Sequence, residues 1–483
     1  MNSRLAATGL GLGLALSGCG SSGSDSATQT TTPTPSTTTG TVNLVVADTP
    51  STAITVLSFE VQITAAVLEP GNVSLLPRPV TVDLAQLVSD TGFLASSVIG
   101  SATYSSLQLT FANPQLTIMN DTGAAIPLAS GSCAAGATCT FEPALNNATV
   151  TISNGVFPLT ITASSTTGLN LDLSIPDLLQ SDLSVTLANG TSVNLSLLSG
   201  NSAAGQQAQI ADVLGTITSV SGNQVNVTTA LGDSLVLVDA GSTVYNYPSS
   251  VCSAADASCL QSGQMVITDL SLAGDGALSI NSVSYVGSSG ASLVKGLVLS
   301  TDMTGALPTA QLLLQYGLNA SSLSAGQIAT VSLPTDTSFA VGTAAYPQVS
   351  TASFAAATDL IPGQELIVSV GSDLVAGSSP TFSTGSVLLE ASQVIGEVAS
   401  VDTASASLDI DGLSGLFTGE RPFIQQMGIQ TGTATTFAGF SPASISGVSA
   451  GQFVAAKGPL FNDTTSTSAT LGAIELRTRS AGN

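Results

Sequence analysis

Few residues of this sequence are of types that perform catalysis. The 483 residues include no histidine, and only 7 lysines and arginines accompany 30 aspartates and glutamates. Without an imidazole, Ser-His-Asp and Cys-His catalysis and histidine metal sites are excluded. A Ser-Lys dyad would have to use Lys295 or Lys457, and both fall in predicted strands of a repeat. We therefore predict that the chain is not an enzyme.

Carboxylates leave two alternatives open. A glycosidase needs only two acids at a fixed separation, but the acids here form no recognisable constellation, and Trp is absent. The segment Asp409-Ile410-Asp411-Gly412 has part of the spacing of a calcium loop. It lacks the third acid and the glutamate at the twelfth position, so we interpret it as a hairpin turn. We predict no metal and no cofactor.

The cysteines indicate an oxidising compartment. Of the five, Cys133 and Cys139 are close in sequence, and so are Cys252 and Cys259. Neither pair has CxxC spacing, so we predict two short-range disulfides rather than zinc ligation or redox chemistry. Cys19 is left over.

Cys19 follows a secretory-type segment. Arg4 precedes an apolar run, Leu5 to Leu16, that is too short to span a bilayer. The ending Leu16-Ser17-Gly18-Cys19 resembles the lipobox of bacterial lipoproteins. That resemblance implies a signal peptide at 1–18, acylation (palmitate) of Cys19, and attachment to the membrane of the cell envelope. Gly20 favours the outer membrane, on its periplasmic or surface face. The alternative is an ordinary signal peptide in which Cys19 is incidental.

The charge pattern and the segment after Cys19 limit the partners. The net charge is −23 and the basic residues form no cluster, so we expect no nucleic-acid partner. Residues 19–40 are rich in Thr, Ser and Pro, which is typical of a disordered tether. A protein or glycan partner stays open.

Period-two alternation of apolar and polar residues dominates residues 41–200. Phe59, Val61 and Ile63 show it, as do Leu169, Leu171 and Leu173. Strands with one polar, solvent-exposed face and one apolar, buried face predict an antiparallel β-sandwich. A change of phase predicts a bulge near Leu57, and a short helix is expected from Leu84 to Val88.

Residues 211–480 contain a threefold internal repeat. Its starts align on Gly215, Gly296 and Gly396, which lie 81 and 100 residues apart (215 to 296, 296 to 396). A Gly-Gln step recurs later in each unit, at Gly263-Gln264, Gly363-Gln364 and Gly451-Gln452. Repeats of this size, at 211–287, 292–392 and 393–480, suit small closed β-barrels. The first glycine should sit where a strand bends, and Gly-Gln should be a turn.

Two family resemblances support this division. The opening Gly40 to Pro50, the long strand with Val61 and Ile63, and Tyr104 to Leu109 resemble domain of unknown function 4382, which occurs at the N-terminus of bacterial lipoproteins. The repeats resemble domain of unknown function 5666, a family of small β-barrel modules. These resemblances imply secreted β domains and no known activity.

The sequence thus favours an all-β chain, with an N-terminal sandwich and three barrel-like repeats. The expected function is that of a non-catalytic, lipid-anchored envelope protein with a structural or interaction role. The alternative is an extracellular glycan- or ligand-binding protein, and a carboxylate hydrolase is a more remote one.

Overall fold

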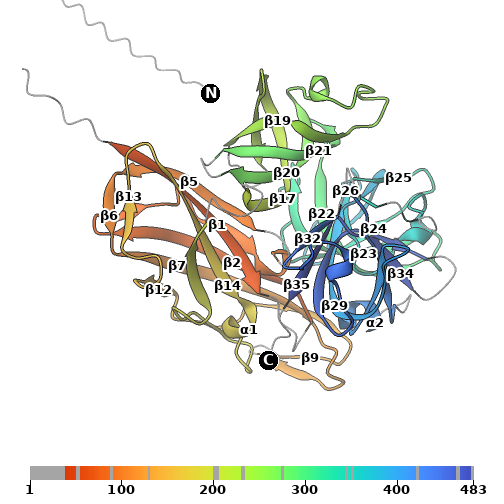
Figure 1. Ribbon diagram of the computed structural model, residues 1–483. Helices are drawn as coiled ribbons and strands as arrows, with labels where there is room; N and C mark the ends of the chain where they lie inside the picture. Colours follow the sequence, from red (N-terminus) through yellow and green to blue (C-terminus); the bar gives the residue numbers. More distant parts are fainter. Residues whose placement is uncertain are drawn as a thin grey trace, which may run out of the picture. The chain divides into compact units, whose positions relative to one another are not determined.

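The regular structure is almost entirely β-strand (Figure 1). This computed structural model describes residues 38–49, 55–87, 91–128, 131–198, 206–229, 234–273, 277–342, 346–347, 349, 353–419, 424–433, 435–463 and 468–479. Residues 1–37, for which the sequence predicts a signal peptide, an acylated Cys19 and most of a tether, lie outside the described residues. None of the helices within these ranges is long and apolar enough to cross a membrane.

The N-terminal lobe is a sandwich of two sheets. The first has the order β16 (Val193–Leu197), β14 (Thr166–Ser174), β1 (Thr39–Thr49), β5 (Gly92–Gly100). The second has the order β10 (Thr138–Phe141), β7 (Ser106–Met119), β2 (Thr55–Glu69), β3 (Val73–Ser74), with β12 (Thr149–Ile152) on β7 and β4 (Val80–Asp83) on β2. Alternating side chains such as Leu44, Phe59, Phe111 and Leu171 form one buried core between the sheets.

Short elements complete the sandwich. Its small two-stranded pairings are β6 (Ala102–Tyr104) with β13 (Leu159–Ile161), β8 (Ile126–Leu128) with β9 (Gly131–Cys133), and β11 (Leu145–Asn146) with β15 (Val185–Thr186). Helix α1 (Ile175–Leu178) follows β14, and a 3₁₀ helix (Leu84–Gln86) follows β4. The 3₁₀ helix occupies the place where the sequence predicts a short helix.

Among the named strands of the sandwich that the structure describes, pairing is antiparallel with two exceptions. β1 runs parallel to β14 over nine residue pairs, from Thr41↔Thr166 to Thr49↔Ser174, and the short β11 is parallel to β15. Alternation predicts which face of a strand is buried, but it carries no information on the direction of the neighbouring strand. A register shift between Val56 and Ser58 confirms the bulge predicted near Leu57.

The first repeat is a closed five-stranded barrel. Its order is β17 (Gln206–Ser221), β18 (Gln224–Thr229), β19 (Ser234–Asn246), β21 (Leu278–Ser288), β20 (Gln264–Ala273). The third strand is parallel to the fifth, and the other pairs are antiparallel. This is the order 1-2-3-5-4 of the OB-fold, a five-stranded Greek-key barrel.

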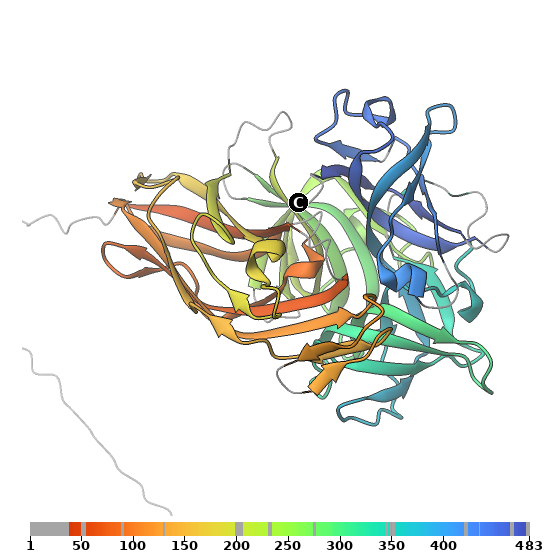
Figure 2. The same ribbon diagram turned by 90° about the horizontal axis from the view of Figure 1, so that it is seen from below.

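The other two repeats keep this order with the third and fifth strands each broken in two. The second barrel contains β22 (Leu293–Asp302), β23 (Thr309–Leu318), β24 (Ile328–Ser332), β25 (Ser338–Val341), β26 (Glu365–Ser369), β27 (Thr381–Ser383) and β28 (Ser386–Leu389). The third contains β29 (Ala391–Asp402), β30 (Ser407–Asp411), β31 (Met427–Gln430), β32 (Thr436–Ala438), β33 (Phe453–Asn462), β34 (Ala469–Gly472) and β35 (Glu475–Arg479). The half-strands of both pair in parallel. The three barrels run from green to blue in Figures 1 and 2.

The repeated glycine marks a close crossing in each barrel. A Cβ at Gly215, Gly296 or Gly396 would lie 2.7, 2.9 or 2.7 Å from a carbonyl oxygen of the barrel's second strand. Such contacts leave no room for a side chain. The glycine therefore lets the long first strand lie close against the second, at the position where the repeat predicts a bend.

The Gly-Gln step is a turn that is hydrogen-bonded to the first strand of the barrel. The glycine has φ of +86°, +87° and +83° in the three units, and its N–H donates to a carbonyl of the first strand at 2.8 to 2.9 Å. The glutamine Oε1 accepts from the backbone N–H three residues earlier, at 2.8 to 2.9 Å. A 3₁₀ helix precedes each turn, at Ala257–Cys259, Ala357–Asp359 and Ile445–Gly447.

The two cysteine pairs are joined as their spacing predicts. Cys133 bonds to Cys139 in the sandwich, and Cys252 bonds to Cys259 in the loop between the third and fourth strands of the first barrel. Each closes a local loop, so neither ties one lobe to another. Contacts between lobes must come from other side chains.

Candidate functional site

Some charged side chains point outward from the barrel strands and are nevertheless buried in the protein interior. Successive side chains of a strand face opposite sides, so Leu366 and Val454 point into their barrels while Glu365 and Lys457 point outward. These outward side chains are only 4% and 2% exposed. They are buried because one barrel covers the outward face of another, as Leu214, Met265 and Ile267 pack on Leu293 and Ile367.

Three barrels meet at the carboxylate of Asp212. Lys295 of β22 places Nζ 3.0 Å from Asp212 Oδ2, and Lys457 of β33 places Nζ 3.6 Å from the same oxygen. Lys295 Nζ also lies 2.7 Å from Glu365 Oε2, and the hydroxyl of Tyr316 donates to the Asp212 carbonyl at 2.9 Å. We call Asp212, Lys295, Glu365 and Lys457, with the neighbouring acids Asp269 and Glu390, the junction cluster.

Electrostatics keep the central pair ionised. Burial would raise the pKa of Asp212, but the ammonium groups of Lys295 and Lys457 outweigh it and hold that pKa at about 2. Burial would likewise lower the pKa of Lys295, and the carboxylates of Asp212 and Glu365 instead raise it well above its usual range. The pair is therefore charged at neutral pH despite its burial.

The remaining acids of the junction cluster take up protons more readily than usual. Burial, reinforced by the Asp212 charge, raises the pKa of Asp269 and raises that of Glu390 well above its ordinary value. Four acids with two lysines would carry two uncompensated charges if all were ionised. Protons taken up by Glu390 and Asp269 would bring the buried cluster toward neutrality, which lowers the cost of burying it.

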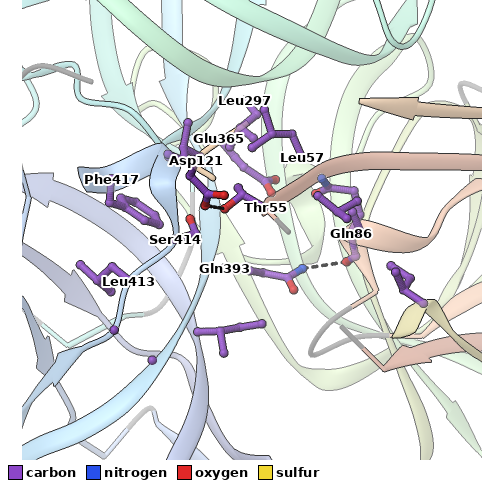
Figure 3. A pocket seen from close by; sticks show the side chains of 18 of the residues that line it. Thr55, Leu57, Gln86, Asp121, Leu297, Glu365, Gln393, Leu413, Ser414 and Phe417 are labelled. Atoms are coloured by element: carbon purple, nitrogen blue, oxygen red, sulfur yellow. Dashed lines mark hydrogen bonds between the residues drawn. The ribbon is translucent and has the colours of Figure 1, made fainter. Parts of the chain in front are cut away.

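Two clefts flank the junction cluster. The first, of about 440 Å³, lies among the sandwich, the second barrel and the third barrel, and we call it the Phe417 cleft. Figure 3 shows Thr55 and Asp121 of the sandwich on one side and Leu413, Ser414 and Phe417, before and in α2 (Gly415–Gly419), on another. Thr55 donates to Asp121 at 2.8 Å. The lining of this cleft mixes polar residues such as Glu365 and Gln393 with apolar ones such as Leu297 and Phe417.

The second cleft, of about 420 Å³, lies among the sandwich, the first barrel and the second barrel, and Gln393 of the third barrel also lines it. We call it the Gln315 cleft. Polar groups come from β2, β4, β17, β22 and β23, and apolar walls come from residues such as Leu87, Phe93 and Leu235. Gln86 and Gln393 line both clefts, and Gln393 Nε2 donates to the Gln86 carbonyl at 2.7 Å (Figure 3).

Several polar atoms in the Gln315 cleft are buried without a hydrogen-bond partner. They are both amide atoms of Gln315, Oε1 of Glu60 and Oδ2 of Asp83. Gln315 is only 9% exposed. A buried polar atom without a partner costs about 1–3 kcal/mol, so four such atoms in one cleft mark a place where a bound molecule would supply the missing bonds.

The two carboxyl groups of this cleft are neighbours across a strand pair. Glu60 of β2 and Asp83 of β4 are opposite residues, which places their side chains on the same face. Asp83 Oδ1 accepts from the N–H groups of Phe59 and Ala85, at 2.8 and 3.1 Å. Burial raises the pKa of Asp83 to about 6, and burial with the neighbouring Asp83 charge raises that of Glu60 to about 7. Together they can hold a proton or face a cation.

The residues singled out in the sequence do not converge on one site. The disulfides Cys133–Cys139 and Cys252–Cys259 are in different lobes. Asp409 lies in β30 and accepts from the Ser400 hydroxyl at 2.8 Å, and Asp411 ends the same strand. Within the described residues, no three acids or cysteines are placed to hold a metal ion. Lys295 and Lys457, discounted as serine partners, are instead the centre of the junction cluster.

Comparisons with known proteins add little. No model of a protein family matches the chain, and no curated protein matches it. Among solved structures, a chain described as "drosophila Unr CSD456" aligns with 56% of this chain and 98% of its own length, at 10% identity and a TM-score of 0.13. A score this low carries no argument, so the functional case depends on the residues themselves.

Proposed function

We propose that this chain is a non-catalytic, lipid-anchored protein of the bacterial cell envelope that acts as a rigid interaction scaffold. The observation that supports it best is the junction cluster, in which side chains of three barrels share one buried carboxylate. Barrels connected only by flexible linkers would move independently. Barrels joined through a buried ion network keep fixed mutual positions, as a scaffold requires.

Anchoring rests on the lipobox-like Leu16-Ser17-Gly18-Cys19. Acyl chains contribute about 0.8 kcal/mol per buried methylene, so two or more chains hold a protein stably at a membrane. The test is to express Cys19→Ser and the unchanged chain in a Gram-negative host and to fractionate the cells. We expect the unchanged chain with the outer membrane and Cys19→Ser in the soluble periplasmic fraction. Ser17→Ala is the matched control, and equal membrane association of all three chains would contradict the anchor.

The scaffold role has its own test. Small-angle scattering of the soluble Cys19→Ser chain should fit one rigid body, and Lys295→Met, which breaks the junction cluster, should give a larger and more variable particle. An unchanged scattering profile for a folded Lys295→Met chain would mean that the cluster does not fix the barrels.

A second candidate function is ligand binding by the β domains. The observation that favours it is the Gln315 cleft, with its four buried polar atoms that lack partners. This function is compatible with a scaffold, since the cleft forms where lobes meet.

A further inference from the structure

The unpartnered atoms of the Gln315 cleft indicate which class of ligand the cleft can bind. Of its four unpartnered atoms, Oε1 of Glu60, Oδ2 of Asp83 and Oε1 of Gln315 are oxygens, and only Nε2 of Gln315 is a donor. An ionised carboxylate only accepts hydrogen bonds. A molecule that completes this set must therefore bring several N–H or O–H donors.

The charges around these atoms favour a cation. Lys295, the basic group in the wall, is already shared between Asp212 at 3.0 Å and Glu365 at 2.7 Å. Its charge is thus compensated within the junction cluster. Glu60 and Asp83 have no basic side chain among their described hydrogen bonds and ion pairs. The negative charge of this carboxyl pair is therefore the charge that a cation bound in the cleft would compensate.

The rest of the cleft is apolar. Leu87, Phe93 and Leu235 form walls within a volume of about 420 Å³, which is in the range of small-molecule sites. A hydrated metal ion would gain nothing from such walls. An alkyl or aryl group would bury its surface against them.

We propose that the Gln315 cleft binds a small organic ammonium ion, with its N–H groups on Glu60, Asp83 and Gln315 and its apolar body against Leu87 and Phe93. A primary ammonium has three donors and one positive charge, which matches three acceptors beside a carboxyl pair. This inference rests on the second candidate function, ligand binding, and is independent of membrane anchoring.

Proton release should accompany binding. The titratable groups that line the same cleft as the carboxyl pair are Asp212 on β17, Lys295 on β22 and Tyr316 on β23, and the charge of Glu365 on β26 acts on Asp83. The pKa values of Glu60 and Asp83 are about 7 and 6 in the empty cleft, and an adjacent ammonium lowers both. Affinity should therefore rise between pH 5 and pH 8, with net loss of protons from the protein.

The test is isothermal titration of the full chain with n-hexylammonium chloride, with 1-hexanol, sodium hexanoate and calcium chloride as comparison probes. We expect one hexylammonium per chain, with at least tenfold weaker binding of the other three. Glu60→Gln and Asp83→Asn should each weaken hexylammonium binding about tenfold. The exposed-acid controls Glu142→Gln and Asp336→Asn should leave it unchanged.

Titration of the unaltered chain in two buffers of different ionisation enthalpy measures the protons released, so the outcome does not depend on any variant folding. Proton release near pH 6.5 supports the proposal. Binding of hexanol or hexanoate as tight as that of hexylammonium would overturn the ammonium class while leaving ligand binding intact. No binding of any probe would overturn the proposal and count against the ligand-binding candidate. Equal affinity in the cleft variants and the controls would also overturn it.

Discussion

Lys295 and Lys457 direct their ammonium groups to a single oxygen, Oδ2 of Asp212, at 3.0 and 3.6 Å. They are the only lysines of the chain. One belongs to the first strand of the second barrel and the other to the fourth strand of the third, while Asp212 belongs to the first strand of the first. The contact of both lysines with one carboxylate makes the three repeats depend on each other.

Removing Lys295 should destabilise the whole unit. Lys295→Met leaves Asp212 and Glu365 buried without their nearest counter-charge, which typically costs about 3–5 kcal/mol when a buried pair is broken. Urea unfolding, followed by circular dichroism, should show this loss. Arg78→Met alters an exposed basic residue of the sandwich and should change stability by about 0.5 kcal/mol at most. Equal stability of the two variants would contradict the structural role of the cluster.

The stability of the chain should depend on pH in two opposite ways. Asp212 has a pKa of about 2, lowered from 3.8, so its contribution is complete above pH 4 and is lost as pH falls toward 2. Asp83 has a pKa of about 6, raised from 3.8, so its contribution is complete below pH 4 and is lost as pH rises through 6. The free energy of unfolding should therefore decrease between pH 4 and pH 7.

Asp83→Asn isolates the second effect. An asparagine keeps an oxygen for the N–H groups of Phe59 and Ala85 but does not titrate. The variant should lose up to about 3 kcal/mol of the pH-dependent change in stability between pH 4 and pH 7. The check is urea unfolding of the unchanged chain and the variant across this range. An identical pH profile would show that Asp83 does not titrate in the cleft.

Local features of the structure were predictable from the sequence because they follow from neighbouring residues. Alternation placed Phe59, Val61 and Ile63 in the core, and the phase change near Leu57 is a bulge. The recurring glycine and the Gly-Gln step mark a strand crossing and a turn in each repeat. Each of these features is determined by a few residues of one strand or turn and by one neighbouring strand.

The side-chain contacts between different lobes were not predictable in the same way. A lysine at an alternate position of a strand is expected to face water, and nothing within its own repeat tells that a second barrel covers that face. The outward neighbours of Lys295 and Glu365, Leu293 and Ile367, are apolar, and this is the signal that could have indicated a buried outer face. The Gln315 cleft is harder still, since Glu60 and Gln315 are 255 residues apart (60 to 315).

Replacing one of the repeated glycines, Gly215, Gly296 or Gly396, by alanine should lower the stability of the chain. At Gly396 a Cβ would lie 2.7 Å from the Asp411 carbonyl oxygen and 3.1 Å from Ile410 Cβ, so β29 and β30 would have to separate. Overpacking of this kind costs about 1–3 kcal/mol. Gly428→Ala in β31 is the matched control, because its nearest contact is 3.4 Å. Thermal unfolding should show a lower midpoint for Gly396→Ala only, and equal midpoints would rule out a steric role for this glycine.

The three turn glutamines should differ in importance. Gln364 is fully buried, accepts from Ile361 N at 2.9 Å, and donates to Asp359 O at 3.1 Å and to Leu460 O of the third barrel at 2.9 Å. Gln452 is partly exposed and accepts from Ser449 N at 2.8 Å. Gln364→Met leaves three buried backbone groups unpaired and should cost about 3 kcal/mol or more, against about 1 kcal/mol for Gln452→Met. Urea unfolding of both variants measures the difference. If the two were equally stable, the hydrogen bond from Gln364 to Leu460 would contribute nothing to holding the second and third barrels together. Other contacts between these barrels, such as the hydrogen bond from Asn462 to the Thr358 carbonyl and the packing of Tyr346 on Phe461, would then do so with the junction cluster.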